Sequence, residues 1–144
     1  MTHTTYDGLP VAAEAPFGAA IVVYRRAATG LEFLVLHRAH DGPAFEGDWA
    51  WTPPAGARRP DEDPDACAKR ELYEETKLDL PLQLTTHGSA DWLVYMAHAP
   101  TDALVVLDAE HDRFEWVTAD PAARLCRPDR VSAQLRAVAA SLGA

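Results

Sequence analysis

The sequence predicts a mixed α/β or α+β domain, in which strands precede a helix, further strands follow, and a second helix ends the chain. Three observations support this. An apolar, β-branched run over residues 17–24 is typical of a strand buried on both sides. Asp63 followed by Pro64 is a helix-start signal. Apolar residues recur at helical spacing near the C-terminus. Together these patterns predict layers of helix and sheet.

The first strand is followed closely by a second. Arg25 and Arg26 end the first apolar run, residues 27–30 supply a turn, and an apolar pattern resumes over residues 31–38. Two such runs joined by a short turn predict a β-hairpin. Residues 40–48 are rich in Gly, Pro and Asp, and we interpret them as a surface loop that can border the substrate.

The clearest element is a helix with Asp63 as N-cap and Pro64 at its first position, extending to about Thr76. Before it, residues 53–54 are prolines that cannot continue a sheet ladder, and Gly56 permits close backbone approach. We therefore expect the chain to turn sharply into the helix.

Four apolar runs and a helix complete the predicted elements. Strand candidates lie at residues 82–87 and 92–99, and shorter runs at residues 104–107 and 114–117 flank an acidic segment. The closing helix is expected to begin near Asp129. Its apolar residues recur at i, i+4, i+7 and i+11: Val131, Leu135, Val138 and Leu142.

We expect a single domain over residues 1–144, because a chain with 48% hydrophobic and 24% charged residues can bury one core. Residues 1–12 are expected to be a flexible tail without the basic and apolar regions of a secretory signal. No apolar run reaches the length of a membrane span. These observations favour a soluble, cytoplasmic protein with no membrane partner.

The acidic charge balance argues against one class of partner. A net charge of −9 and a pI near 5.0 disfavour nucleic acid as a partner by bulk electrostatics, whereas a phosphate-bearing small molecule is compatible if metal ions offset local charge. Cys67 and Cys126 are too few for a disulfide framework and are interpreted as free thiols in a reducing cytoplasm. The oligomeric state, including a homodimer, stays open.

Three carboxylates share a face of the predicted helix. Glu71, Glu74 and Glu75 are spaced i, i+3 and i+4, which places them within about a third of the helix circumference. Their mutual repulsion destabilises the helix, so a positive partner is expected there. For hard carboxylate oxygens the natural candidate is a divalent cation, Mg²⁺ or Mn²⁺.

The segment 56–78, GARRPDEDPDACAKRELYEETKL, resembles the signature of the Nudix hydrolases, G-x5-E-x7-R-E-U-x-E-E-x-G-U, in which U is aliphatic. The resemblance implies an α/β/α sandwich around a mixed sheet. It also implies a pyrophosphohydrolase acting on a nucleoside diphosphate linked to another group. Eight of nine fixed positions agree: Gly56, Glu62, Arg70, Glu71, Leu72, Glu74, Glu75 and Leu78.

The resemblance also implies roles for these residues. Glu71, Glu74 and Glu75 would be metal ligands, and one of them, which the sequence does not single out, would orient or deprotonate the attacking water. The main-chain carbonyl of Gly56 would reach a metal. Arg70 would hold the glutamates by charge-assisted hydrogen bonds.

Two further acidic positions are interpreted by the same resemblance. Glu62 is similar to the family's loop glutamate and is expected to be a structural partner of the helix rather than a ligand. Glu110 lies in a region where some Nudix enzymes place an extra metal ligand or base. Asp108, Asp112 and Glu115 compete with Glu110 for this role.

Lys77 is the one departure, since it stands where the family has its second glycine. The left-handed conformation that a glycine adopts there costs a lysine on the order of 1 kcal/mol. Lysine does suit the negative end of the helix dipole. We expect a slightly altered helix exit and intact chemistry, because no carboxylate is lost.

Arg38, Arg58 and Trp51 are the candidates for substrate binding. Either arginine could meet a phosphate, with an ordinary surface arginine as the alternative. Trp51, like Trp49 and Tyr24, could stack on a base, with core packing as the alternative. The histidines at positions 3, 37, 40, 87, 98 and 111 lack the spacing of a zinc site and are interpreted as non-ligands.

The expected function is metal-dependent hydrolysis of a diphosphate bond by water attack on phosphorus, since metal ions activate water and clamp phosphate oxygens. Nucleoside triphosphates, including oxidised ones, are the first candidates. Alternatives are a dinucleoside polyphosphate or nucleotide-sugar hydrolase and a non-catalytic nucleotide- or ADP-ribose-binding module. Such a module is expected to lose box glutamates, and Glu71, Glu74 and Glu75 are all present.

Overall fold

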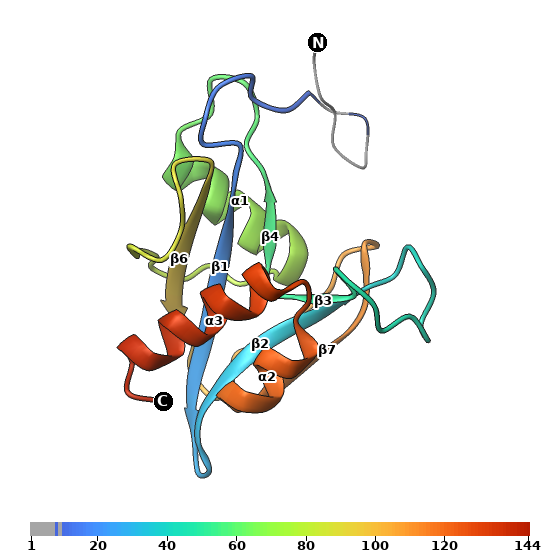
Figure 1. Cartoon of the computed structure of the whole chain (residues 1–144), viewed down its shortest axis with the longest axis vertical. Helices are drawn as coiled ribbons and strands as arrows, with labels where there is room; N and C mark the ends of the chain where they lie inside the picture. Colours follow the sequence, from blue (N-terminus) through green and yellow to red (C-terminus); the bar gives the residue numbers. More distant parts are fainter. Residues whose placement is uncertain (1–7, 9) are drawn as a thin grey trace.

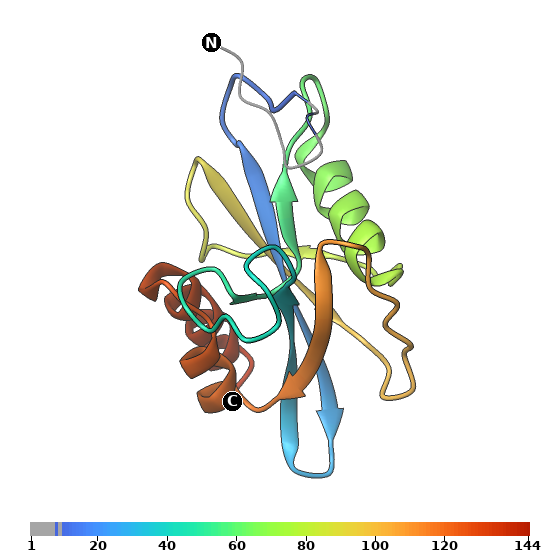
Figure 2. The same ribbon diagram turned by 90° about the vertical axis from the view of Figure 1, so that its right-hand side faces the viewer.

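A mixed sheet of seven strands lies between helices on both of its faces (Figure 1). The structure is a computed structural model that describes residue 8 and residues 10–144. Figure 2 shows α1 (Pro64–Thr76) on one side of the sheet, with α2 (Ala119–Leu125) and α3 (Asp129–Ser141) on the other. The α/β/α sandwich around a mixed sheet is therefore confirmed.

The central strand β1 pairs on both sides. It forms the predicted antiparallel hairpin with β2, runs parallel to β6, and pairs antiparallel with β4 near its start. The strand order is β3-β2-β1-β6-β5, with β7 paired to β2. The strands are β1 (Gly18–Ala27), β2 (Gly30–Arg38), β3 (Trp51–Thr52), β4 (Ala55–Ala57), β5 (Gln83–Leu84), β6 (Trp92–His98) and β7 (His111–Val117).

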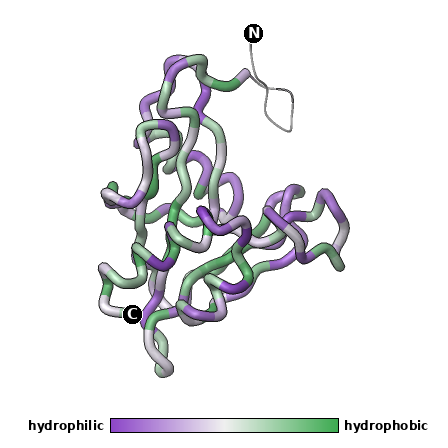
Figure 3. Tube along the Cα trace, viewed as in Figure 1, coloured by the Kyte–Doolittle hydropathy of each residue, from purple (hydrophilic) through white to green (hydrophobic). Residues whose placement is uncertain are grey.

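Alternation along the strands divides the core between the two faces. On the α1 face, Ile21 and Val23 pack with Leu72 of the helix. On the opposite face, Val22 packs with residues of α3, including Leu135. Figure 3 shows hydrophobic residues gathered along the strands in the middle of the molecule. The prediction that the first strand is buried on both sides is confirmed.

Helix α1 spans the residues that its sequence predicts. The carboxylate of Asp63 accepts hydrogen bonds from the backbone N–H groups of Asp65 at 3.0 Å and Ala66 at 3.3 Å, and Pro64 is the first helical residue. At the other end, Lys77 itself adopts the left-handed conformation, with φ of 62°. The expected altered exit is wrong, because the lysine takes the conformation usual for the family's glycine.

Three parts of the second half differ from the predictions. The strand expected over residues 82–87 is reduced to β5, since the Thr85 hydroxyl and N–H both bond to Val94 and the chain then bends. Residues 104–107 form no strand. There the N–H of Val106 bonds to the carbonyl of Thr76 instead. Helix α2 was not predicted, because seven residues are too few for a periodic pattern.

Most of the expected N-terminal tail lies outside the described residues. Within the described part, Ala12 is buried and its N–H donates to the carbonyl of Arg58 at 2.7 Å. Cys67 and Cys126 are free and buried, as predicted. None of the described helices combines the length and the apolar character needed to cross a membrane.

Candidate active site

Two of the three helix glutamates are withdrawn from solvent. Glu71 is 8% exposed and Glu75 is 4% exposed, and both lie on the side of the helix that packs against the sheet. The side chain of Glu74 is 45% exposed. A charged side chain is rarely buried unless it is paired or coordinates a metal. The burial therefore favours a binding role for this face over a solvent-facing one.

Arg70 connects the acidic residues of the loop and the helix. Its guanidinium donates to both carboxylate oxygens of Glu62, at 2.7 and 2.9 Å, and to Glu71 at 2.8 Å and Glu74 at 3.3 Å. A fifth bond reaches the carbonyl of Ala57 at 3.0 Å. The structure thus gives Arg70 the geometry expected of a positioning residue and Glu62 that of a structural partner.

Strand β4 passes close against the buried glutamates. A Cβ atom on Gly56 would overlap the carboxylate of Glu71, so only glycine fits at this point. The backbone N–H of the preceding Ala55 donates to Glu75 at 3.0 Å. The prolines before β4 and the missing side chain at Gly56 together allow the backbone to meet the carboxylates of α1.

Burial dominates the protonation of Glu71 and Glu75. It raises the pKa of Glu71 to about 7, although Arg70 acts in the opposite direction. Burial, followed by the charge of Glu71, raises the pKa of Glu75 well above its usual value. The pKa of Glu62 is lowered instead, mainly by its hydrogen bonds from Arg70. A divalent cation beside Glu71 and Glu75 would favour their charged forms.

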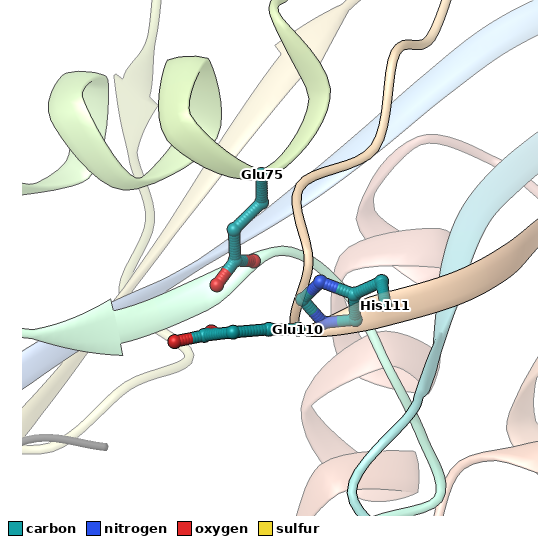
Figure 4. A group of neighbouring side chains, drawn as sticks. All are labelled: Glu75, Glu110 and His111. Carbon is teal, nitrogen blue, oxygen red and sulfur yellow. The ribbon is translucent and has the colours of Figure 1, made fainter. Parts of the chain in front are cut away.

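The segment before β7 completes the acidic cluster. Glu110 and His111 point toward Glu75 across the gap from α1 (Figure 4), and one ligand atom from each residue lies within 4.8 Å of the other two. Of the competing acidic residues, Asp108 bonds to His111 at 2.8 Å and Asp112 bonds to His37 at 2.8 Å. The structure thus brings Glu110 next to Glu75, while Asp108 and Asp112 are each bonded to a histidine.

A cavity of about 430 Å³ opens beside this cluster. Its size lies within the range of small-molecule sites. The acidic cluster contributes Glu75, Glu110 and His111 to its wall, and β1 and α3 contribute apolar side chains such as Val22 and Leu135. The remaining wall includes three aromatic and two basic residues: Phe17, Trp49, Trp92, Arg38 and Arg130.

The structure brings only one of the three predicted substrate-binding residues to this cavity. Arg38 lines it. Trp51 is 3% exposed, packs in the core and donates its indole N–H to Glu46. Arg58 donates to three backbone carbonyls, those of Pro16, Glu62 and Glu14, so its guanidinium fixes the loop instead.

Trp49 lines the cavity in place of Trp51. It is 37% exposed, and the guanidinium of Arg130 lies over its ring at 5.0 Å. Residues two apart on a regular strand share a face, but Trp49 has a φ of 69° and the alternation is broken there. The sequence indicated that a tryptophan of residues 49–51 could stack on a base, but it did not show which of the two faces the cavity.

His111 and Arg130 also line the cavity, and the sequence interpretation gave neither of them a role in the site. The signal for His111 was its position next to Glu110. Arg130 lies in the first turn of α3, and only the packing of that helix beside the sheet brings it to Trp49. The interpretation of every histidine as a non-ligand did not anticipate the position of His111.

Comparison with known proteins agrees with the fold and the motif. The NUDIX domain profile matches residues 15–138. The chain is 28% identical over 121 residues to the asymmetrical bis(5'-nucleosyl)-tetraphosphatase of Rattus norvegicus, covering 75% of this chain and 78% of the relative. It is 29% identical over 137 residues to the enzyme of that name from Caenorhabditis elegans, covering 86% and 94%.

A solved structure gives the same result. The binary complex of a C. elegans Ap4A hydrolase superimposes with a TM-score of 0.72 and 25% identity, over 88% of this chain and 96% of that one. The family profile covers most of the chain, and the relatives named above are hydrolases of phosphoric anhydrides. The chain therefore belongs to the NUDIX domain family and is a pyrophosphohydrolase.

Proposed function

We propose that this protein is a metal-dependent hydrolase that cuts a diphosphate bond of a nucleotide by water attack on phosphorus, with the chemistry located where Glu75 and Glu110 border the cavity. The observation that carries the proposal is the burial of Glu71 and Glu75 on α1, together with the position of Glu75 in the cavity wall. Burial raises the pKa of both carboxylates, and a bound cation would offset this by favouring their charged forms.

The residues present fit a divalent cation. Glu71, Glu74, Glu75 and Glu110 offer hard oxygen donors, and the carbonyl of Gly56 is a further candidate. We take Mg²⁺ or Mn²⁺ as the cofactor. The bound cation would lower the pKa of water and neutralise charge on the phosphate oxygens.

The protein's own residues would position the reactants. Arg70 fixes Glu62, Glu71 and Glu74 in one hydrogen-bonded unit, which limits the freedom of the carboxylates. One of the glutamates would accept the proton of the attacking water; Glu71, Glu74, Glu75 and Glu110 all stay candidates.

The cavity wall supports a nucleotide substrate. Arg38 is exposed and lines the cavity, so it is our candidate for a phosphate contact. Trp49 is partly exposed and lines the cavity, and we propose it instead of Trp51 as the residue on which a nucleobase stacks.

Among nucleotides, we place dinucleoside polyphosphates first. The names of the rat and C. elegans relatives support this choice, and nucleoside triphosphates become the second candidate. A non-catalytic nucleotide- or ADP-ribose-binding module is disfavoured because Glu71, Glu74 and Glu75 are all present.

We also propose that residues 1–144 act as one domain. The two free thiols support a reducing compartment, and we propose the cytoplasm.

A substrate panel tests the proposal. The protein would be incubated with a dinucleoside tetraphosphate, nucleoside triphosphates, a nucleotide sugar and ADP-ribose, with Mg²⁺, with Mn²⁺ and with a chelator. Products formed in ¹⁸O-labelled water would identify the attacked phosphorus. We expect turnover only with a divalent cation, and fastest for the dinucleoside polyphosphate. Binding without turnover on every compound would contradict the proposal.

A further inference from the structure

The acidic cluster at the cavity includes a nitrogen donor. Glu75, Glu110 and His111 each place a ligand atom within 4.8 Å of the others. Figure 4 shows the imidazole of His111 directed toward the glutamate of α1 rather than away from it. Sites that hold Mg²⁺ are built mainly from oxygen donors, so an imidazole at this position is not explained by a Mg²⁺ site alone.

The ring of His111 is fixed by a second carboxylate. Its Nδ1 lies 2.8 Å from Oδ1 of Asp108, and the His111 side chain is only 7% exposed. Because a carboxylate accepts the bond, Nδ1 carries the hydrogen, which leaves the lone pair of a neutral ring on Nε2. Metal-binding histidines are usually oriented in this way, by a carboxylate that holds the other ring nitrogen.

The backbone around His111 is also fixed. The carbonyl of Glu110 accepts a hydrogen bond from the N–H of Ala39 at 2.8 Å, which joins this segment to the end of β2. Strand β7 then continues from His111 along β2. The backbone of His111 is therefore held by the sheet, and its imidazole is held by Asp108.

We infer that His111 is a metal ligand through Nε2, beside Glu75 and Glu110, and that this mixed nitrogen and oxygen site prefers a first-row transition ion such as Mn²⁺ to Mg²⁺. The inference rests on the proposed metal-dependent function and adds a ligand to it. Asp108 acts as a positioning residue, since its carboxylate holds the imidazole of His111. Imidazole suits transition ions, whereas Mg²⁺ favours oxygen and retains its water.

Pulsed electron paramagnetic resonance on the full chain tests this directly. The metal-free protein would be loaded with Mn²⁺, and modulation from a coordinated ¹⁴N nucleus would be recorded. Labelling all histidines with ¹⁵N should replace the ¹⁴N modulation with a ¹⁵N pattern, which identifies a histidine ligand without any mutation. His111→Gln should abolish it. His98→Gln is the matched control and should retain it, because His98 stacks on Tyr24 instead.

Affinity measurements give a second readout. His111→Gln and Asp108→Asn should each weaken Mn²⁺ binding by about 10- to 100-fold and Mg²⁺ binding by much less. Mn²⁺ bound without nitrogen modulation in the wild-type protein, or modulation that persists in His111→Gln, would overturn the inference while leaving the proposed function intact. Absence of both cation binding and turnover would instead refute the proposed function itself.

Discussion

Arg70 donates two parallel hydrogen bonds to the carboxylate of Glu62, from Nε at 2.7 Å and from Nη2 at 2.9 Å. The pair is partly buried, with side-chain exposures of 17% and 14%. A third donor of the same guanidinium, Nη1, reaches Glu71 at 2.8 Å. The planar group therefore sets the distance between the loop before α1 and the glutamates on it.

Arg70→Lys tests this positioning role. Lysine keeps the charge but cannot form the two-pronged contact. We expect kcat to fall about 100-fold, since small displacements of catalytic groups cost rates of this order, while the fold is retained. Lys69→Arg, one residue earlier and exposed, is the matched control. Equal kcat in Arg70→Lys and the wild type would show that the contact does not position the glutamates.

Gly56→Ala tests the close approach of β4 to α1. The added Cβ would overlap the carboxylate of Glu71, so the strand or the glutamate must move. We expect a lower melting temperature and a loss of kcat of about 100-fold, measured by calorimetry and by substrate turnover. The neighbouring change Ala57→Gly removes a Cβ instead of adding one, and it should leave most activity in place.

Lys77→Gly should stabilise the protein. Lys77 has a φ of 62°, a conformation that costs a side-chain-bearing residue about 1 kcal/mol more than glycine. The same substitution at Lys69, inside α1, should destabilise it by about 1 kcal/mol. Denaturant unfolding of both variants measures the two effects. Destabilisation by Lys77→Gly would indicate that other contacts of the lysine outweigh the backbone cost.

The raised pKa of Glu71 predicts a pH-dependent stability in metal-free buffer. Burial raises this pKa from 4.5 to about 7, so between these values the folded protein binds a proton that the unfolded chain has lost. Stability should therefore fall as pH rises through this window, by about 3 kcal/mol in full. Glu71→Gln should show a shallower decline in urea unfolding with chelator present. Parallel curves for the two proteins would contradict this origin.

The sequence predicted best what is encoded locally. The start of α1 depends on Asp63, whose carboxylate accepts from two of the first N–H groups, and on Pro64, which has no N–H to satisfy. The first and last residues of the helix were predicted correctly, but the left-handed exit at Lys77 was not. The resemblance to the Nudix signature implied the roles of Arg70 and Glu62, and the structure shows the two side chains in contact. These features involve residues close in the chain.

The sequence could not predict what long-range packing decides. Trp49 and Trp51 have similar local contexts, but the backbone turn at Trp49 places one in the cavity and the other in the core. His111 reaches Glu75 only because β7 pairs with β2 beside α1. The short helix α2 depends on tertiary contacts of Ala122 and Ala123 rather than on a periodic pattern.

The central claim is that buried glutamates of α1 bind the cations that enable hydrolysis, and Glu75→Gln tests it most directly. Glutamine keeps the shape and an oxygen that can accept from Ala55, but it removes the negative charge. Turnover of the best panel substrate should fall by several orders of magnitude, with weaker cation binding and an unchanged circular dichroism spectrum. Glu74→Gln should also lower turnover strongly. Wild-type turnover in both variants would contradict the account.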